Sequence, residues 1–510
     1  MIIPRLVVLS LSLAFGSGEE TCVLDKDGSK MCGSMVVEVF GNGESGEPRA
    51  MLELDKIKCV TRATFEAAVS VAGCGDAASC EPRDAVGRWP RNCQELIKMA
   101  MEDGVQPAAT PIRVYAVPRN KRFIFATEEI GFTRRIPHIE NGNITLTTLA
   151  LRPRLFGVEG FLSPTEADAL IDEALAINDE EHKLMRSSTG ASGYNPSKMR
   201  TSENAWLQMS EPAISLKQRA FGLLGFPVYN EKMADGLQIL RYNISKAYIA
   251  HHDYLSRPSN IEPEAMDPFV GGANRLATLF LYLSDVEDGG QTVFPDVTKE
   301  QIFHDHDIRA TYFETRQLSS SQLSTLRESA GIFDPKSWEF SMVQDCYSKL
   351  AVRPKKARAI LYYSQFPTGK LDPLSKHGGC PVLNGTKWAA NLWLWNKEPP
   401  FTSSRFQKTP PHKNIKAPSS APSSPIAIEV MVTYDGEHSD LVLYWEGTVK
   451  MNDLKPRVPL RLKTYVGHKF VAKISDDTTI STFTVLQGIE KYKITDHDTI
   501  YDYEEESLSS

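Results

Sequence analysis

Two histidines and an aspartate lie almost side by side in "YIAHHDYLSRPSN" (248–260), in a 510-residue chain with only 11 histidines. Side chains alternate along a β-strand, so His251 and Asp253 would project from one face and His252 from the other. An imidazole and a carboxylate on one strand face supply two ligands of a 2-His-1-carboxylate triad. Such a triad binds one face of an octahedral iron and leaves three positions open. The stretch therefore predicts a metal site that needs a third ligand.

A second stretch, "KHGGCPVLNGTKWAANLWLW" (376–395), supplies that ligand and a positive charge. His377 is the candidate for the second imidazole, and Lys387 follows ten residues later on the next predicted strand. A lysine is a compact cation that pairs well with the distal carboxylate of a dicarboxylic keto acid. Together the two stretches predict a metal site with an anion site beside it.

Two other sequences match the same pattern by itself. His438 and Asp440 have the same spacing, and "HDHD" (304–307) resembles a metal cluster. No histidine–lysine pair follows His438, because the residue ten positions after His468 is Thr478. Single short motifs often mislead, so we interpret these sequences as a turn and a solvated loop.

The overall composition is that of an ordinary globular protein, with a net charge of -7. This charge gives no basic face for nucleic acid, so we expect no nucleic-acid partner. Residues 1–18 carry Arg5, the apolar run Leu6–Phe15 and then small residues, which is the layout of a secretory signal peptide. A membrane anchor with the N-terminus in the cytoplasm is the alternative. We expect no membrane span after signal cleavage.

The cysteines indicate an oxidising compartment. Two of the eight, Cys346 and Cys380, stand far along the chain, and the other six lie within the first hundred residues: Cys22, Cys32, Cys59, Cys74, Cys80 and Cys93. Even numbers in both groups favour disulfides, whose connectivity the sequence leaves open. A zinc site in the first group is the alternative, although no CxxC pair occurs. We expect the endoplasmic reticulum lumen, with the Golgi or secretion as alternatives.

The pattern along the chain predicts several regions. Residues 19–145 form a Cys-rich N-terminal region. Residues 150–397 open with a capping box at Ser163 and Glu166, then turn to short β-branched and aromatic runs, which predict a barrel or jelly roll. A Pro/Ser-rich linker (398–425), a small all-β module (426–495) and an acidic tail (496–510) follow. The predicted class is mainly β with flanking helices (α+β).

The middle region resembles the prolyl 4-hydroxylase family of Fe(II)/2-oxoglutarate dioxygenases, especially its plant, algal and animal transmembrane members. The shared segments, in order, are "RTSENAWL" (200–207), "YNISKAYIAHHDY" (242–254), "NRLATLFLYLSDVEDGGQTVFP" (274–295), "CYSKLAVRPKKARAILYY" (346–363) and "HGGCPVLNGTKWAANLW" (377–393). This resemblance implies a double-stranded β-helix (jelly-roll) catalytic core. For the C-terminal module we expect a small β-sandwich.

The resemblance also implies roles for single residues. His251, Asp253 and His377 match the iron ligands, and Lys387 matches the residue that binds the C5 carboxylate of 2-oxoglutarate. The remaining matches are Tyr242, Tyr282 and Thr292 as hydroxyls around that carboxylate, Arg275 and Trp393 as peptide contacts, and Cys346–Cys380 as a disulfide. A packing role inside the barrel is the alternative for the hydroxyl and contact residues.

The implied activity is that of a procollagen-proline 4-dioxygenase-like oxidoreductase. It would hydroxylate prolyl residues with Fe(II), 2-oxoglutarate and O2, release succinate and CO2, and use L-ascorbate to restore oxidised iron. The alternatives are an oxygenase for another residue and an inactive peptide-binding protein. Two expanded loops, 255–272 and about 297–345, are expected to act as lids that shape specificity. The oligomeric state stays open.

The C-terminal module resembles the β domain of the von Hippel–Lindau protein, a reader of hydroxyproline. Thr464 and His468 match polar residues of that reader's pocket, and Phe470 stands where the reader has tryptophan. Met451 replaces an expected tyrosine. The alternative, which we favour, is a β-sandwich that assists folding or presents substrate.

Overall fold

The structure is a computed structural model. It describes residues 22–24, 30–32, 35–54, 62–107, 109–137, 144–178, 183–187, 199–207, 210–255, 261–298, 306–400, 428–439, 441–445, 449–464, 469–474, 478–485, 491–495 and 499–501. Within these ranges no helix has the length and apolar character that crossing a membrane requires. The expected signal peptide (1–18) lies outside the described residues, as do most of the linker and of the acidic tail.

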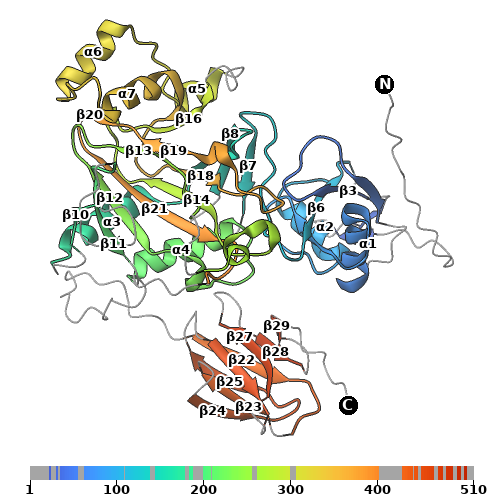
Figure 1. Cartoon of the computed structure of the whole chain (residues 1–510). Coiled ribbons are helices and arrows are strands. Elements are labelled where there is room, and N and C mark those ends of the chain that lie inside the picture. Colours follow the sequence, from blue (N-terminus) through green and yellow to red (C-terminus); the bar gives the residue numbers. More distant parts are fainter. Residues whose placement is uncertain are drawn as a thin grey trace, which may run out of the picture. The chain divides into compact units, whose positions relative to one another are not determined.

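The chain divides into two compact units, Met1–Pro411 and His412–Ser510. The division falls inside the predicted Pro/Ser-rich linker. Figure 1 shows an α/β region and a larger β region in the first unit, and a β-sandwich in the second.

The N-terminal part of the first unit is a small α/β domain. Its sheet has the order β4-β3-β6-β5, with β3 and β6 parallel. Residues from both helices pack on one face of this sheet, and Phe40 and Tyr115 on the other face join the main core of the next region. The elements are β3 (Val36–Gly41), β4 (Ala50–Glu53), α1 (Arg62–Cys74), β5 (Cys80–Asp84), α2 (Cys93–Glu102) and β6 (Ile112–Pro118), preceded by the pair β1 (Cys22–Leu24) and β2 (Lys30–Cys32).

The second part is the expected jelly roll, built from a large and a small sheet that face each other. The large sheet has the order β10-β11-β12-β21-β14-β18-β9-β8-β7, and the small one β13-β19-β16-β17. The strands of the large sheet are β7 (Thr133–Ile136), β8 (Ile144–Ala150), β9 (Leu155–Glu159), β10 (Met185–Arg186), β11 (Glu203–Leu207), β12 (Leu237–Tyr242), β14 (Arg275–Tyr282), β18 (Ala359–Tyr363) and β21 (Lys387–Trp395). Those of the small sheet are β13 (Tyr248–His251), β16 (Thr292–Thr298), β17 (Lys349–Val352) and β19 (His377–Gly379), with β15 (Asp288–Gly289) and β20 (Val382–Asn384) as a separate pair.

The region begins earlier than the sequence analysis placed it. Strands β7 and β8 belong to the large sheet, and Phe123 and Phe125 lie in its core. The predicted boundary near residue 150 is therefore wrong, because β7 pairs with β8 and β8 with β9, which in turn pairs with β18 of the large sheet.

Alternation along the strands of the large sheet separates two cores. Leu279 and Leu392 pack with helices α3 (Pro164–Ala176) and α4 (Glu211–Leu223), whereas Phe280 and Ala389 face the barrel interior. The capping box predicted at the start of α3 is confirmed. Short 3-10 turns lie at η1 (Glu231–Met233), η2 (Pro263–Met266), η3 (Pro268–Val270) and η5 (Pro373–Ser375).

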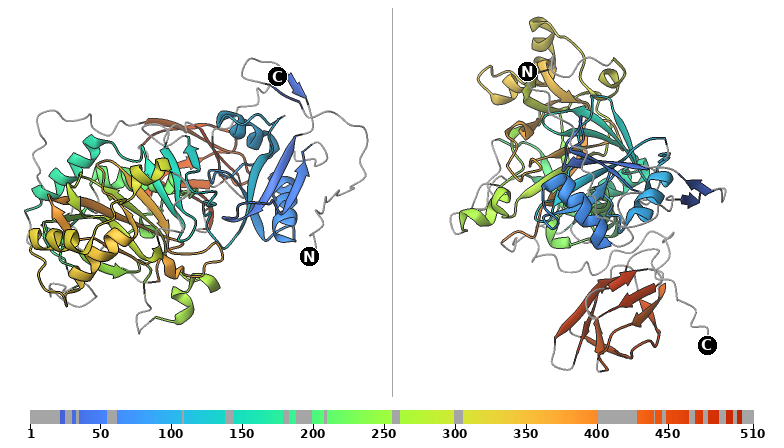
Figure 2. Two further views of the ribbon diagram at one scale, coloured as in Figure 1. Left: turned by 90° about the horizontal axis from the view of Figure 1, so that it is seen from above. Right: turned by 90° about the vertical axis from the view of Figure 1, so that its right-hand side faces the viewer.

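The long insertion lies outside the small sheet, where its helices gather at one end of the catalytic region in each view (Figures 1 and 2). Val293 and Ala351 pack with α6 and α7, while their neighbours Phe294 and Val352 face the barrel interior. The described helices of the insertion therefore cover the outer face of the small sheet. They do not form the expected lid. They are α5 (His306–Tyr312), α6 (Ser320–Ser329) and α7 (Trp338–Ser348).

The other expanded loop, 255–272, is described from residue 261 onward. Lys121 Nζ, from the segment that leads into the barrel, donates to the carbonyl oxygen of Pro268 at 2.6 Å. The loop is thus tied to the N-terminal side of the barrel, and its role in specificity stays a prediction.

Helix α7 braces the strand that carries His377. A disulfide joins Cys346 on α7 to Cys380, directly after β19, as the family resemblance implied. At Gly378 a Cβ atom would lie 2.6 Å from Met342 Cε of α7 and 3.0 Å from the Tyr248 carbonyl oxygen. Glycine at this position therefore permits the close approach of helix and strands.

The C-terminal unit is a sandwich of two four-stranded sheets, β25-β22-β28-β29 and β24-β23-β26-β27. Its last strand extends past the predicted boundary at 495. The strands are β22 (Ile428–Tyr434), β23 (Leu441–Trp445), β24 (Val449–Leu454), β25 (Leu460–Thr464), β26 (Lys469–Lys473), β27 (Thr479–Thr484), β28 (Lys491–Ile494) and β29 (Thr499–Tyr501).

We predict that the Cys346→Ser/Cys380→Ser double variant loses more stability than Cys74→Ser/Cys80→Ser, which removes the disulfide between α1 and β5. The two crosslinks close separations of 34 and 6 residues. Loop-closure entropy gives a cost of about 4 kcal/mol for the longer loop and about 2 kcal/mol for the shorter one. Urea unfolding followed by tryptophan fluorescence measures both. Equal losses would show that the longer crosslink does not constrain the unfolded chain as argued.

Candidate metal centre

The three predicted metal ligands meet between two paired strands of the small sheet. Strands β13 and β19 are antiparallel, and His251 lies directly opposite His377 in their register. Asp253 follows β13 by two residues, on the same side as His251. The ligand atoms of the three residues lie within 4.8 Å of one another, and no other such group of three occurs among the described residues. Strand pairing thus creates the triad that the sequence suggested.

Both imidazoles are oriented so that Nε2 faces the other ligands of the triad. His251 Nδ1 lies 2.9 Å from the carbonyl oxygen of Ile249, and His377 Nδ1 lies 2.9 Å from that of Ser375. Each Nδ1 therefore carries the proton and donates it, which leaves each Nε2 with a lone pair for a metal. Burial lowers the pKa of His377 to about 4, so this imidazole is neutral, as a metal ligand must be.

The carboxylate of Asp253 is ionised although it is buried. Burial by itself would raise its pKa, but the adjacent imidazoles and Arg275 outweigh that effect and hold the pKa well below its usual value. Asp253 Oδ1 lies 3.6 Å from His251 Nε2, and Oδ2 lies 3.4 Å from His377 Nε2. A carboxylate and two imidazole nitrogens in this arrangement fit a divalent first-row metal.

Two hydroxyls that the sequence analysis did not select contact the same carboxylate. Thr278 Oγ1 donates to Asp253 Oδ2 at 2.7 Å, and the Tyr362 hydroxyl lies 2.9 Å from that oxygen and 2.8 Å from His377 Nε2. Thr278 lies on the same strand as Tyr282, an even number of residues away, so strand alternation would have placed both on the interior face. Nothing in the sequence distinguishes Tyr362 from its neighbour Tyr363.

Lys387 forms a cationic site deep in the barrel. Its Nζ is buried and has no hydrogen-bond partner among the described residues. The nitrogen lies 5.0 Å from the ring centre of Phe280 and within 5.5 Å of those of Tyr242 and Tyr282. Burial lowers its pKa to about 7. A buried, unpaired ammonium in an aromatic cage fits an anionic ligand group.

The other predicted hydroxyls surround this lysine. Tyr242 lies directly opposite Lys387 in the pairing of β12 with β21. The Tyr282 hydroxyl donates to Thr292 Oγ1 at 2.8 Å, and burial raises the pKa of both tyrosines. The structure therefore places all three side chains at the end of the barrel that Lys387 occupies.

Arg275 and Trp393 lie at the opposite end of β21. The Arg275 guanidinium stacks over the Trp393 ring at 4.1 Å, its Nε donates to Asp235 at 2.8 Å, and its Nη1 donates to the backbone carbonyl of Asp253 at 3.1 Å. Trp393 lies next to Trp206 (ring centres 6.2 Å apart), and its buried indole N–H has no partner in the described part of the chain. The triad thus lies between the end of the barrel that holds Lys387 and the end that holds Arg275, Trp393 and Trp206. We call the second the aromatic end.

The motif "RTSENAWL" also contributes a residue, although the sequence analysis selected none from it. Arg200 stacks over the Tyr248 ring at 4.7 Å, and that ring stacks on the His251 imidazole at 3.8 Å. Arg200 is fixed by hydrogen bonds to Ser202 and Gln238. This cation–aromatic stack holds the His251 imidazole in place.

Comparison with known proteins identifies the family. A protein-family sequence model with the description "2OG-Fe(II) oxygenase superfamily" matches residues 237–395. A crystal structure of a viral collagen prolyl hydroxylase from Paramecium bursaria Chlorella virus-1 aligns with 48% of this chain and 96% of its own, at 21% identity and a TM-score of 0.29. Prolyl 4-hydroxylase 2 of Arabidopsis thaliana is 32% identical over 249 residues, which cover 48% of this chain and 67% of that protein. The probable prolyl 4-hydroxylase 8 of the same plant is 30% identical over 256 residues, 50% of this chain and 72% of that protein. The chain belongs to the prolyl 4-hydroxylase family.

The side chains of this family member fit the cofactors of a 2-oxoglutarate dioxygenase, which are Fe(II), 2-oxoglutarate and O2. His251, Asp253 and His377 would hold the iron. The unpaired Lys387 ammonium would hold the distal carboxylate of 2-oxoglutarate. The use of ascorbate stays a prediction.

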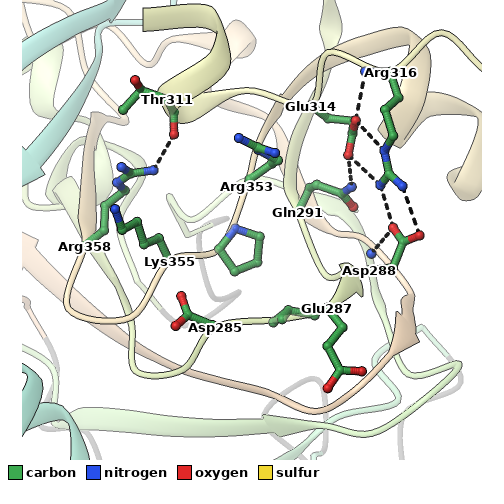
Figure 3. Close-up of a pocket in the computed structure, with 13 residues that line it drawn as sticks. Asp285, Glu287, Asp288, Gln291, Thr311, Glu314, Arg316, Arg353, Lys355 and Arg358 are labelled. Carbon is green, nitrogen blue, oxygen red and sulfur yellow. Dashed lines mark hydrogen bonds and ion pairs between the residues drawn. The ribbon is translucent and has the colours of Figure 1, made fainter.

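A cavity of about 420 Å³ in the dioxygenase lies away from this centre (Figure 3). It is lined by turns around Asp288 and Lys355, and none of the triad residues nor Lys387 borders it. Many of its charges neutralise one another, since Arg316 pairs with Asp288 and Glu314. The chemistry therefore belongs to the triad and Lys387, which lie outside this cavity.

The remaining candidates do not form a described metal site. His438 donates its backbone N–H to the Tyr434 hydroxyl, and Asp440 lies outside the described residues. For "HDHD" (304–307), the first two residues lie outside the described ranges, and His306 begins α5.

In the C-terminal sandwich, Phe470 packs inside the core and stacks on Phe483 at 5.4 Å, and Thr464 is also buried. These positions favour a packing role for both residues. His468 lies outside the described residues.

We predict that 2-oxoglutarate binding takes up a proton at alkaline pH. In the empty site the pKa of Lys387 is about 7, so about nine-tenths of the side chain is uncharged at pH 8. A bound carboxylate raises this pKa. Uptake should therefore approach one proton at pH 8 and vanish below pH 6, and the affinity should fall as the pH rises above 7.

Calorimetry of the Mn(II)-loaded protein in buffers of different ionisation enthalpy measures the uptake. Lys387→Arg is the matched control, because a guanidinium stays protonated and should give none. Zero uptake by the unaltered protein at pH 8 would contradict the assignment of Lys387 as the carboxylate-binding cation.

Proposed function

We propose that this dioxygenase hydroxylates the 4-position of prolyl residues in peptides or proteins. The observation that carries the proposal is the combination of a His–Asp–His triad with a buried, unpaired Lys387 in one barrel. The names of its relatives, prolyl 4-hydroxylases of Arabidopsis thaliana, support the choice of proline.

Two oxidations would be coupled at the bound metal, that of 2-oxoglutarate and that of the prolyl residue. With Fe(II) in place, one oxygen atom of O2 enters succinate as 2-oxoglutarate loses CO2, and the other becomes the hydroxyl of the product. The protein supplies the geometry for this coupling. Lys387 fixes one end of 2-oxoglutarate, which sets the distance of the other end from the triad.

The aromatic end of the barrel suits an extended peptide. The Trp393 indole N–H, which has no partner among the described residues, can donate to a peptide carbonyl, and the neighbouring, tilted rings of Trp393 and Trp206 offer apolar surface. Proline-rich segments adopt a polyproline II conformation with an open backbone, and aromatic grooves recognise them well. The Arg275–Asp235 ion pair holds this surface in place.

We propose the secretory pathway as the location, most directly the endoplasmic reticulum lumen. Disulfides Cys74–Cys80 and Cys346–Cys380 support an oxidising compartment.

The proposal predicts that the protein adds one oxygen atom to proline when it is incubated with Fe(II), 2-oxoglutarate, ascorbate and a proline-rich peptide library. Mass spectrometry locates the added oxygen, and an assay for succinate measures turnover. Asp253→Ala should abolish both, because it removes the anionic ligand.

The two alternatives give different results in the same experiment. Succinate with no modified proline would point to an oxygenase for another residue. Neither product, with metal loading verified, would point to an inactive peptide-binding protein. Full turnover by Asp253→Ala would refute the metal centre itself.

A further inference from the structure

The two oxygens of Asp253 have different surroundings. Oδ1 lies toward His251 Nε2 at 3.6 Å. Oδ2 receives the Thr278 hydroxyl at 2.7 Å and lies 2.9 Å from the Tyr362 hydroxyl. The side chains of Asp253, Thr278 and Tyr362 are all buried. The carboxylate therefore has one oxygen with two donors beside it and one with neither of them.

The available protons decide where the Tyr362 hydroxyl points once a metal is bound. His377 Nδ1–H already donates to the Ser375 carbonyl oxygen, so Nε2 carries a lone pair. The phenol has one proton and two acceptors within reach, His377 Nε2 at 2.8 Å and Asp253 Oδ2 at 2.9 Å. A metal on Nε2 removes the first acceptor, so the proton goes to Oδ2.

We infer that Tyr362 and Thr278 form a positioning pair that keeps Asp253 a one-oxygen ligand of the metal. Two O–H donors occupy lone pairs of Oδ2 and draw its charge away from the metal, which leaves Oδ1 as the better ligand. The inference rests on the proposed metal centre, which it deepens.

The coordination number gives this pair a function. A triad of single ligands leaves three of six positions open. A carboxylate bound through both oxygens would occupy one of the three. A keto acid that chelated the metal would need two positions and O2 the third, so an Asp253 bound through both oxygens would leave too few. The hydroxyl pair thus protects the position that O2 needs.

The fold holds the pair in a fixed place. Thr278 on β14 and Tyr362 on β18 are direct cross-strand partners in the middle of the large sheet. Their side chains point inward together, and Tyr362 is further held by an edge-to-face contact with Phe294 at 5.5 Å.

The test compares Tyr362→Phe with Tyr363→Phe in the full chain. Tyr363 is the matched control because it is a buried phenol on the same strand, but it packs in the helix-side core, where its hydroxyl accepts from the Phe125 backbone N–H. Titration with Co(II), followed by its visible absorption, gives both the affinity and the coordination geometry without turnover.

We expect Tyr362→Phe to weaken Co(II) binding by about 10- to 100-fold, the usual effect of losing a residue that orients a metal ligand. Its Co(II) spectrum should change, and in the Fe(II) enzyme the KM for O2 should rise more than the KM for 2-oxoglutarate. Tyr363→Phe should leave all three unchanged. Thr278→Val removes the other donor to the same oxygen, so it should act in the same direction, and it carries the test if Tyr362→Phe folds poorly.

The outcomes separate this inference from the proposed function. Wild-type affinity and spectrum in both Tyr362→Phe and Thr278→Val would overturn it while the metal centre stands. Equal losses in Tyr362→Phe and Tyr363→Phe would overturn it as well, since they would show a general packing effect. No Co(II) binding by the unaltered protein would refute the metal centre, and the inference with it.

Discussion

The pairing of β13 with β19 is the constraint on which the catalytic centre depends. It places His251 directly opposite His377, although 126 positions separate them in the chain. A shift of one residue in this register would turn one imidazole to the other face of the sheet. Much of the surrounding structure therefore holds these two short strands in register: the crosslink from α7, the tight contact at Gly378 and the stacking of Tyr248 and Arg200 on His251.

Burial has opposite effects at the two charged centres of the barrel. At Asp253 the neighbouring imidazoles and Arg275 outweigh desolvation, so the carboxylate stays ionised and ready for a cation. At Lys387 no anion among the described residues compensates, so burial lowers the pKa of the ammonium until a ligand supplies a negative charge. Each of these buried charges would thus be neutralised by a bound molecule: that of Asp253 by a metal ion and that of Lys387 by an anionic ligand. Such uncompensated groups are common in active sites.

The sequence predicted the local parts of this arrangement. Strand alternation placed His251 with Asp253, and the spacing of His377 and Lys387 within one segment revealed the other two groups. The capping box of α3 was equally local. What the sequence did not predict depends on pairing between distant strands. Tyr362 and Tyr363 are indistinguishable until β18 takes its place beside β14, and that pairing turns one to the metal and the other to the helices. The same holds for the pair β9–β18, through which β7 and β8 become part of the large sheet, and for the position of the insertion behind the small sheet.

The shared core between the N-terminal sheet and the barrel limits how the molecule can be divided. Phe123 and Phe125 form a continuous series of edge-on aromatic contacts from Tyr115 to Phe156 and Tyr363. A recombinant fragment that starts after residue 150 would lack Tyr115, Phe123 and Phe125. It would expose the rings of Phe156 and Tyr363 and leave β9 as an open edge, a combination that favours aggregation. The smallest soluble catalytic fragment should therefore retain the α/β domain, whose Phe40 and Tyr115 share the core of the barrel.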